Sequence, residues 1–578
     1  MMDPWVVGSD PSERFPLWTR ANVGEVFPDP VQPLTFTLMM REGVEGAFRD
    51  AFVDMGAFTH DEFTEGKMEM LGVFGSYCYL NASLFRIFGE RAPGLSAQDI
   101  DALFFGAQPG IPAYEEQPGD ANPERSAAIG EVFQWVMTTE TLEAPLAGEK
   151  LVNGLRDKRP NHSSMTNEEL WSYSKDLLLT YFRGLFKEHI FVTFLSTVPV
   201  GALTQICEAI GRPEDTMKLI SGVGDVESAA PSQAMWELGR IVAADPDLVD
   251  LFDQGTSGLY ERLIALPDGS SNFMLLFDKF LYEYGARGPN EWEPSKNTWE
   301  TQPELALAAI DRMRLAGEDA NPKIKGAAMT ANRERLTSEI AEILSGDPET
   351  QGMFLAAARS AVLFQAGRER TKTNCIKSEH ESRLAMFTLG RRFVDDGLAE
   401  DVSDFALLTS EEIDEWIKDP AAFKDVISSR RSLQVEYAEI TEPFVFHGIQ
   451  PDPSEWVRRD TATVDLVKAG DVLQGFPGCP GTVTGIARII TDPMNPRALA
   501  PGEILVAPLT DPSWTPLFVA AGGVIVNVGA AQSHSIIVSR ELGIPCVPSV
   551  TNATLSIPDG AEVTVDGDTG TVTINSVP

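Results

Sequence analysis

The stretch GAAQSHSIIVSRELGIPCV, residues 529–547, places one histidine between two serines, directly before an apolar helical run. Ser533 predicts a helix N-cap, Gly543 stands where a left-handed C-terminal residue belongs, and Pro545 prevents the helix from continuing. His534 is therefore predicted at the N-terminus of a helix. Backbone N–H groups and the positive end of the helix dipole make this position favourable for a phosphate group.

A histidine in this position is either a reactive group or a packing residue. An imidazole with a pKa near about 6.5 is largely neutral and nucleophilic at pH 7, so it can accept a phosphoryl group and release it again. The alternative is a histidine that only caps or packs, and an isolated Ser-His pair favours that alternative. The neighbouring sequence is needed to choose between a reactive and a packing role for this histidine.

Short β-branched runs flank the histidine, namely TVTGIARII, EILVAP, GVIVN, CVPSV, AEVTVDG and GTVTI. They predict strands, with SHSIIVSREL as the one clear helix among them, and hence a compact β/α domain at residues 471–578. Residues 448–470, rich in proline and charge, are predicted to form a linker. Residues 1–447 are predicted to form a large, mostly helical region of one unit or two, because apolar residues recur at three- and four-residue spacing. The expected fold class is multidomain, α plus α/β.

Three segments of the helical region give specific predictions. Residues 353–397 are long enough for a helical hairpin or an extended pair of helices, and Thr409 with Glu412 predicts a capping box that starts another helix. The apolar run at residues 189–206 contains Ser196, Thr197 and Pro199. It is expected to be a buried helix, or a broken helix lining a pocket, rather than a membrane span.

Composition narrows the classes of partner. The chain has 85 Asp and Glu against 46 Lys and Arg, a formal charge of -39, which opposes binding to nucleic acid or to an anionic membrane. The five cysteines are scattered without a CxxC pair, so neither a disulfide framework nor a structural zinc site is expected, and no metal site is predicted. The N-terminal residues lack the pattern of a signal peptide. We therefore expect a cytoplasmic protein.

The sequence from about residue 470 to 575 resembles the phosphohistidine swivelling domain of the PEP-utilising enzymes, which include PEP synthase and pyruvate phosphate dikinase. The matching residues follow the family order of Ser-His, an aliphatic run, Ser-Arg-Glu and Gly-Ile-Pro: Ser533, His534, Ile536, Ile537, Val538, Ser539, Arg540, Glu541, Gly543, Ile544 and Pro545. The resemblance implies that His534 accepts a phosphoryl group and that Gln532 and Ser533 help to bind it. Two departures are Ala530, where glycine is common, and Pro-Ser-Val at residues 548–550, where Val-Gly-Val is common.

The N-terminal sequence FPLWTRANVGEVFPDPVQPLTF, residues 15–36, resembles the entrance of the substrate domain in rifampin phosphotransferases and related PEP-synthase-like enzymes. The resemblance implies that Arg20 and Asn22 bind substrate or the phosphoryl group. YGARGPNEWE, residues 284–293, resembles a second element of this group, which implies the same role for Arg287 and Glu291. In this element Ala286 stands where the family has a histidine. Arg20 and Arg287 are equally well explained as ties between helices.

GRERTK, residues 367–372, resembles the Arg-Glu-x-x-Lys helix of the same enzymes. Arg368 and Lys372 are four residues apart, so both project from one helix face and could neutralise an incoming phosphoryl group as catalytic residues. Without the family context, a solvated polar face would explain them. The other histidines lie in no motif and are expected to be structural or on the surface: His60, His162, His189, His380 and His447. Of these, His380 is the best placed to act as a second base.

A helical acceptor-binding region joined to a phosphohistidine domain resembles the phosphohistidine subunit of the phenylphosphate synthases and 4-methylphenyl phosphate synthases. No glycine-rich phosphate loop, ATP-grasp domain or C-terminal PEP/pyruvate barrel is visible, so PEP is not expected as the substrate. The resemblance implies that a separate ATP-grasp subunit binds Mg-ATP and charges His534, which then phosphorylates a small phenol, giving an aryl phosphate, AMP and phosphate. Two alternatives stay open: a component of a rifamycin-type antibiotic phosphotransferase, and a non-catalytic phosphocarrier or regulatory protein. Residues 74–85, FGSYCYLNASLF, could line the acceptor pocket or belong to the core.

Overall fold

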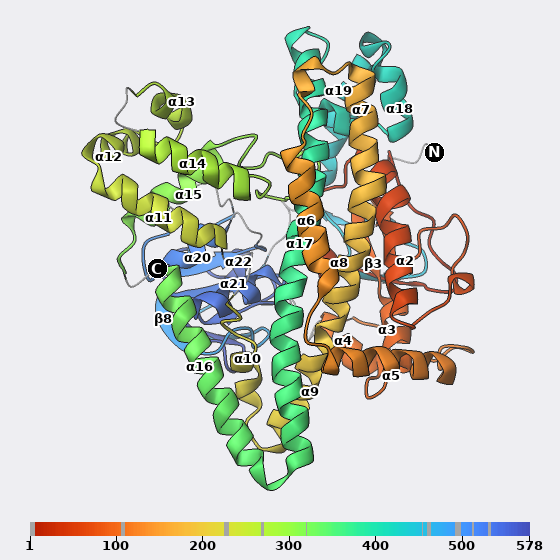
Figure 1. Cartoon of the computed structure of the whole chain (residues 1–578), viewed down its shortest axis with the longest axis vertical. Helices are drawn as coiled ribbons and strands as arrows, with labels where there is room; N and C mark the ends of the chain where they lie inside the picture. Colours follow the sequence, from red (N-terminus) through yellow and green to blue (C-terminus); the bar gives the residue numbers. More distant parts are fainter. Residues whose placement is uncertain are drawn as a thin grey trace. The chain divides into compact units, whose positions relative to one another are not determined.

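The fold is known from a computed structural model (Figure 1), which describes residues 6–105, 110–224, 230–266, 271–318, 321–452, 455–458, 464–491, 499–510, 514–529 and 533–578. The chain forms two compact units, and each unit is built from three separate segments of the sequence. Unit 1 comprises Met1–Leu195, Trp292–Lys296 and Arg370–Thr463, and unit 2 comprises Ser196–Glu291, Asn297–Glu369 and Val464–Pro578. A mostly helical region followed by a β/α domain confirms the predicted fold class. The predicted boundaries 1–447, 448–470 and 471–578 stay a prediction.

Unit 1 contains a four-stranded sheet that the helical periodicity did not reveal. Its strand order is β2-β3-β1-β5, all neighbours antiparallel, with bounds β1 (Leu17–Thr19), β2 (Leu71–Phe74), β3 (Tyr77–Asn81) and β5 (Val445–His447). Gly75 and Ser76 join β2 to β3 with φ angles of 57° and 65°, as a tight hairpin turn requires. Buried aromatic side chains pack together around the sheet: Trp18, Phe74, Tyr77, Tyr79, Phe446 and Trp456. Residues 74–85 therefore include a core hairpin, and Asn81 caps the helix that follows it.

The helices of unit 1 precede and follow these strands along the chain. Their bounds are α1 (Val23–Val26), the π-helix Thr35–Val44, α2 (Glu45–Asp54), α3 (Ala82–Arg91), α4 (Ala97–Phe105), α5 (Pro123–Thr138), α6 (Glu143–Asp157), α7 (Asn167–Asp176), the π-helix Leu177–Phe182, α8 (Arg183–Leu195), α18 (Ser410–Trp416) and α19 (Lys424–Ala438). The predicted capping box of Thr409 and Glu412 is confirmed at the start of α18. Within the predicted linker, β6 (Val457–Arg458) pairs with β4 (Ile440–Thr441).

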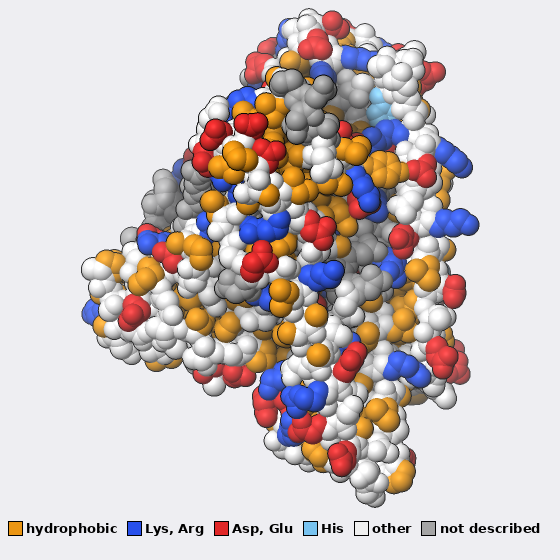
Figure 2. Space-filling view, turned by 60° about the vertical axis from the view of Figure 1, so that its left-hand side comes forward, with side chains coloured by type: hydrophobic (Ala, Val, Ile, Leu, Met, Phe, Trp, Pro, Cys, Tyr) orange, Lys and Arg blue, Asp and Glu red, His pale blue; other side chains and the backbone are white. Residues whose placement is uncertain are grey.

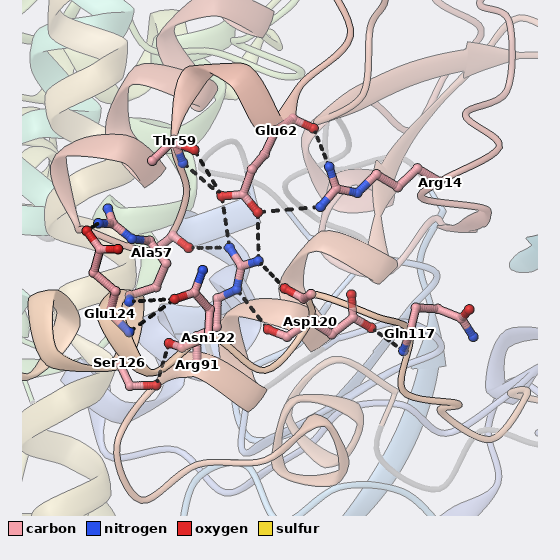
Figure 3. Close-up of polar contacts among 12 residues, drawn as sticks. Arg14, Ala57, Thr59, Glu62, Arg91, Gln117, Asp120, Asn122, Glu124 and Ser126 are labelled. Atoms are coloured by element: carbon pink, nitrogen blue, oxygen red, sulfur yellow. Dashed lines mark hydrogen bonds and ion pairs between the residues drawn. The ribbon is translucent and has the colours of Figure 1, made fainter.

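A fully buried arginine ties several loops of unit 1 together (Figure 3). Arg91 donates hydrogen bonds to the backbone carbonyls of Ala57, Gly119 and Asp120 and forms an ion pair with Glu62 at 2.7 Å. Each guanidinium nitrogen has a partner, which is the condition under which a buried charge is tolerated. Glu62 also forms a capping box with Thr59, so this cluster is a structural one.

The apolar run at residues 189–206 is helical with a break at Ser196, which one of the two sequence alternatives predicted. The pocket that this broken helix was expected to line stays a prediction. α8 ends at Leu195, and α9 (Thr197–Ala209) begins after Ser196 with Pro199 in its first turn, where proline is tolerated. Among the described residues one helical stretch, Asn167–Ala209, counted across the break at Ser196, is long and apolar enough to cross a membrane by length and composition alone. In this structure 44% of its most apolar window is buried.

Residues 353–397, predicted as a hairpin or a pair of helical segments, lie mostly within one continuous helix. α17 (Pro348–Asp395) has 48 residues, and no glycine or proline breaks it, although Gly352, Gly367 and Gly390 lie within it. At 1.5 Å per residue such a helix is about 70 Å long. The division between the two units falls within α17, between Glu369 and Arg370.

Unit 2 combines helices with the C-terminal β/α domain. Its helices are α9, α10 (Thr216–Leu219), α11 (Ala230–Ala244), α12 (Pro246–Asp253), α13 (Leu259–Ile264), α14 (Ser271–Tyr284), α15 (Glu304–Leu315), α16 (Pro322–Ile343), the first part of α17, α20 (Thr515–Ala520), α21 (His534–Leu542) and α22 (Ala553–Ser556). One buried apolar cluster runs from α11, α14 and α15 into β9, α20 and α21. The β/α domain therefore shares a core with these helices.

The predicted strands of the β/α domain are confirmed and form one seven-stranded sheet. The strand order is β11-β10-β9-β8-β12-β13-β7, with bounds β7 (Val472–Gln474), β8 (Thr482–Ile489), β9 (Ile504–Ala507), β10 (Gly523–Val526), β11 (Cys546–Val547), β12 (Glu562–Asp566) and β13 (Thr571–Ser576). Strands β8 to β11 are parallel, and β12, β13 and β7 add antiparallel partners. α20 and α22 are helices that the sequence pattern did not indicate.

Charged side chains of both signs are interspersed on the face seen in Figure 2. Among the described residues, ion pairs on the surface include Lys187 with Asp54 at 2.8 Å and Arg41 with Glu411 at 2.5 Å. Such exposed pairs contribute little stability individually, about 0–1 kcal/mol. This face carries no broad patch of a single sign.

Candidate phosphoryl-transfer site

The helix predicted to begin at His534 is confirmed. In α21 the N–H of Ile536 donates to Oγ of Ser533, the N-cap residue, and Gly543 ends the helix with φ 65° and ψ 40°, a left-handed conformation. Every residue of α21 after His534 is buried, whereas His534 itself is half-buried. The helix therefore lies in the core, and the side chain of its first residue is partly accessible.

Three side chains that sequence reasoning did not single out surround the imidazole of His534. Nδ1 lies 3.2 Å from Oγ1 of Thr510, and Nε2 lies 3.5 Å from Oγ1 of Thr515. The ring of Phe518 meets the imidazole edge to face, with 5.8 Å between ring centroids. A hydroxyl near each ring nitrogen fixes the orientation of the imidazole, since a hydroxyl can donate to one nitrogen and accept from the other.

The position of these groups follows from the parallel part of the sheet. Thr510 comes three residues after β9, and Gly529 comes three residues after β10, so both lie at the carboxyl ends of parallel strands. In open α/β sheets ligands bind at this edge. Thr515 begins α20 and His534 begins α21, so two helix N-termini face the same edge. This arrangement suits the binding of an anion next to the imidazole.

Gly529 allows the chain to pass close to the start of α21. A Cβ atom at this position would lie 2.7 Å from Cβ of Pro548 and 3.2 Å from Oγ of Ser533. Oγ of Ser533 is in turn 2.8 Å from Oγ of Ser535, and both side chains are buried. Gln532 and Ala530 lie outside the described residues, so the predicted role of Gln532 stays a prediction.

The predicted catalytic pair lies on one helix, α17, one turn apart. Nη1 of Arg368 forms an ion pair with Oε1 of its neighbour Glu369 at 2.6 Å, and Lys372 is half-buried. Between them, Oγ1 of Thr371 lies 3.1 Å from Nδ1 of His189 on α8. The pattern of this segment is therefore not that of a freely solvated polar face.

The charge of Glu369 acts on a buried carboxylate of α21. Burial raises the pKa of Glu541, the neighbouring Arg540 acts in the opposite direction, and the charge of Glu369 adds to the rise. Glu541 lies near the C-terminal end of α21, seven positions after His534 and hence about 10 Å along the helix. The charge of Glu369 therefore acts near the end of α21 that is opposite to His534.

Three of the predicted binding residues, Arg20, Arg287 and Glu291, are buried and form ion pairs within the protein. Nε of Arg287 lies 2.9 Å from Oε2 of Glu291, and both side chains are buried. Arg20 pairs with Glu442 at 2.8 Å and donates to the carbonyls of Cys78 and Phe27. These bonds support the structural alternative for Arg20 and Arg287, and a contact with substrate stays a prediction.

Further predictions concern Asn22, His380 and metal binding. Asn22 caps α1 with a φ angle of 63°, a backbone conformation that asparagine tolerates better than most residues. Its predicted binding role stays a prediction. His380 is fully buried on α17, and its Nδ1 lies 3.4 Å from Nη1 of Arg383. Across the parts of the chain that the structure describes, no group of three or more His, Cys, Asp or Glu side chains could hold a metal ion.

Two segments of the chain match models of known protein domains. Residues 499–570, which contain His534 and its three neighbours, match the mobile domain of PEP-utilising enzymes. Residues 189–369 match the fourth domain of rifampicin phosphotransferase. Over these residues the chain is similar to PEP-utilising enzymes. The resemblance seen in the sequence around residues 470–575 is thereby confirmed.

Relatives with curated descriptions extend this similarity. The chain is 32% identical over 386 residues to the prodigiosin synthesizing transferase PigC of Serratia marcescens, which is 64% of this chain and 42% of that protein. It is 27% identical over 369 residues to a rifampicin phosphotransferase of Streptomyces sviceus, 63% of this chain and 41% of that protein. It is 23% identical over 414 residues to the uncharacterized phosphotransferase YvkC of Bacillus subtilis, 69% of this chain and 48% of that protein. The chain thus matches less than half the length of each of these relatives.

Proposed function

We propose that this chain is a phosphotransferase component in which His534 carries the phosphoryl group. The observation that carries the proposal is the setting of His534: a half-buried imidazole at the N-terminus of α21, with Thr510 and Thr515 at its two nitrogens, inside the segment that matches the mobile domain. A histidine that only capped the helix would not need this setting, because Ser533 already provides the cap.

In the first half-reaction an imidazole nitrogen of His534 attacks a phosphoryl donor. The N–P bond forms as the bond between phosphorus and the leaving oxygen breaks. The N–H groups at the start of α21 and the hydroxyls of Thr510 and Thr515 stabilise the charge on the phosphoryl oxygens. The phosphohistidine stores the group until an acceptor takes it.

The proposed donor is Mg-ATP bound by a separate ATP-grasp subunit. No glycine-rich phosphate loop is visible in the sequence, which favours a donor bound by another polypeptide. With a net charge of -39, this chain would bind a nucleotide polyphosphate only in a locally basic pocket. This chain would then form a hetero-oligomer with its ATP-binding partner. Of the two phosphoryl groups that leave ATP, one would stay on His534 and the other would pass to water, so the products would be AMP and phosphate.

The proposed acceptor is a small phenol, such as phenol or 4-cresol, which becomes an aryl phosphate. Arg368 and Lys372, one turn apart on α17, would hold the group during transfer. The match of residues 189–369 to a rifampicin phosphotransferase domain favours a second candidate acceptor, a larger hydroxylated aromatic compound of the rifamycin type. Both candidates use the same phosphohistidine.

Intact-protein mass spectrometry at neutral to alkaline pH tests the proposal. Wild type and His534→Ala are incubated with Mg-ATP, with and without an ATP-grasp protein encoded near this chain. We expect an acid-labile gain of one phosphoryl mass that needs the partner, is absent from the variant and is discharged by 4-cresol. No gain under any condition would refute the phosphohistidine. A gain discharged only by a rifamycin would select the second acceptor, and a gain that no hydroxyl compound discharges would indicate a phosphocarrier.

A further inference from the structure

The C-terminal end of α21 is buried against elements that lie outside the segment matching the mobile domain. Gly543, which ends α21, lies next to α16, since a Cβ atom added to it would be 3.4 Å from Sδ of Met329. The loop after α10 packs against the same helix, and the carbonyl of Gly222 accepts a hydrogen bond from Oγ1 of Thr330 at 2.7 Å. All these elements belong to unit 2, so the contact lies within one compact unit.

Apolar side chains hold the mobile domain in this docked position. One buried cluster contains Leu307, Ile310 and Met313 of α15 together with Phe518 of α20 and Leu542 of α21. Burial of apolar surface favours this contact whatever the pH. A domain that carries a phosphoryl group between two sites also has to leave each site, so an opposing contribution is needed.

Two carboxylates provide this opposing contribution at the end of α21. Glu541 is only 8% exposed and lies beside Arg540, with 3.3 Å between Oε1 and Nε. Glu369 of α17 belongs to the same unit and is 5% exposed, and its charge acts on Glu541. Buried like charges repel, and burying an ionised carboxylate costs free energy that a paired arginine does not fully restore.

The groups that face Glu541 leave its negative charge incompletely compensated. Burial raises its pKa above 4.5 and the charge of Glu369 adds to the rise, whereas Arg540 and the backbone N–H of Val223 act in the opposite direction. The neighbouring thiol of Cys479 is neutral, because burial raises its pKa to about 12. When the domain undocks, water reaches Glu541 and its pKa returns toward the ordinary value. Docking therefore favours the protonated carboxyl group, fully so below pH 4.5, and loses this contribution as the pH rises through the raised value.

We propose that Glu541 makes docking of the mobile domain reversible, because its buried carboxylate charge opposes the apolar contact between α21 and the helices of unit 2. At neutral pH the ionised group favours release, which frees His534 to meet a phosphoryl donor. Docking is independent of the phosphohistidine, but this use of the release rests on the proposed function. Glu541 lies about 10 Å from His534 along α21, so it is a positioning residue and not a catalytic one.

Hydrogen exchange of the full chain tests this role, with wild type and Glu541→Gln compared between pH 5 and pH 8. Each exchange rate is divided by the intrinsic rate at that pH, so that it reports the opening equilibrium. The amides of residues 221–224 and 539–544 report the docked contact. The amides of β8 and β13, which contribute to a different buried cluster, report the fold of the domain itself. Glu562→Gln, at an exposed position on β12 of the same domain, is the matched control.

We expect Glu541→Gln to protect the contact amides at pH 7.5 about tenfold or more above wild type, the factor that corresponds to one unit of pKa shift. The difference should shrink toward pH 5, where more of the wild-type carboxyl group is protonated. The amides of β8 and β13 should not change, and Glu562→Gln should behave like wild type. Equal or weaker protection of the contact in Glu541→Gln, or an equal change in β8 and β13, would overturn the role of Glu541.

A second variant covers the case in which Glu541→Gln does not fold. Glu369→Gln removes the other carboxylate charge, and we expect a smaller gain in protection of the same contact amides at pH 7.5. No gain in this variant would overturn the inference.

Chemical charging with phosphoramidate separates this role from the proposed function. Because His534 is half-buried and lies at the other end of α21, Glu541→Gln should be charged at the wild-type rate, with His534→Ala giving the background. A large loss of charging would show that the substitution distorts α21 and would overturn the positioning role. A wild-type chain that phosphoramidate does not charge would refute the proposed function, while the exchange rates would still decide whether Glu541 opposes docking.

Discussion

Arg368 and Glu369, neighbours in α17, form an ion pair with 2.6 Å between Nη1 and Oε1. Both side chains are largely buried, so the pair is weakly screened by solvent. An arginine held in this way must exchange a carboxylate for phosphoryl oxygens before it can assist transfer. A carboxylate and a phosphoryl group can each offer two oxygens to a guanidinium. The exchange therefore preserves the geometry that the guanidinium prefers.

We predict that Arg368→Ala separates the two half-reactions. Phosphorylation of His534 should proceed at a rate close to that of wild type, whereas discharge to the acceptor should slow by about 10²–10³-fold, the typical loss for one charge-stabilising donor. Mass spectrometry at timed intervals, before and after addition of acceptor, measures both rates. Equal slowing of both half-reactions would contradict a role of Arg368 that is specific to transfer to the acceptor.

The same substitution should also reduce stability, because it removes the arginine from beside the buried carboxylate of Glu369. Breaking such a pair costs about 3–5 kcal/mol when the remaining charge is buried. The double variant Arg368→Ala with Glu369→Gln is the control, since it removes the charge as well. It should regain most of the melting temperature without regaining the discharge rate, and recovery of both would show that Arg368 acts only on stability.

The hydroxyl of Thr510 should affect the uptake of the phosphoryl group by His534. Thr510→Val keeps the shape of the side chain but removes the oxygen 3.2 Å from Nδ1. A single neutral hydrogen bond contributes about 1 kcal/mol, so we expect a roughly fivefold slower charging of His534 by phosphoramidate. Thr484→Val, which removes a hydroxyl paired with Thr564 on exposed β strands, should leave the charging rate unchanged.

The C-terminal β/α domain could be predicted closely because its signals are local. Ser533, Gly543 and Pro545 mark the two ends of α21 by themselves, and the structure has both ends where these residues place them. β-branched runs bounded by glycine and proline likewise gave the strands of the sheet. Each of these signals depends on residues within a few positions of one another.

The parts that sequence reasoning missed depend on contacts between distant residues. Thr510 and Thr515 approach His534 only because parallel strands end at one edge of the sheet. His189 and Thr371 are 182 positions apart, and no local pattern marks their contact. The strand Leu17–Thr19 pairs with Val445–His447, far along the chain, and strands of three residues are too short to show a period of two.

Gly529 should be intolerant of any side chain. The Cβ atom of Gly529→Ala would lie 2.7 Å from Pro548 and 3.2 Å from Oγ of Ser533, which forces the start of α21 to shift. We expect a loss of about 1–3 kcal/mol, measured by chemical denaturation, together with slower charging of His534. Gly326→Ala, within α16 and with no atom near its added Cβ, is the matched control and should stabilise by about 0.5–1 kcal/mol. A neutral effect of Gly529→Ala would show that the segment can move aside at no cost.

A buried carboxylate in unit 1 should make stability depend on pH. Burial raises the pKa of Glu293 above its ordinary value of 4.5, while hydrogen bonds from Thr35 and Ser295 act in the opposite direction. Because the folded pKa lies above the unfolded one, folding favours the protonated form. This contribution to stability is fully present below the ordinary pKa and is lost as the pH rises through the raised value.

Glu293→Gln removes this dependence, since the amide is neutral at every pH and can keep bonds to Thr35 and Ser295. At pH 7–8 the variant should unfold at a higher temperature than wild type, and the difference should shrink as the pH falls toward 4.5. Thermal melts across this range measure it, with Glu13→Gln at an exposed position as the control. A variant that is less stable than wild type at pH 8 would mean that the ionised carboxylate is stabilised by its hydrogen bonds more than burial penalises it.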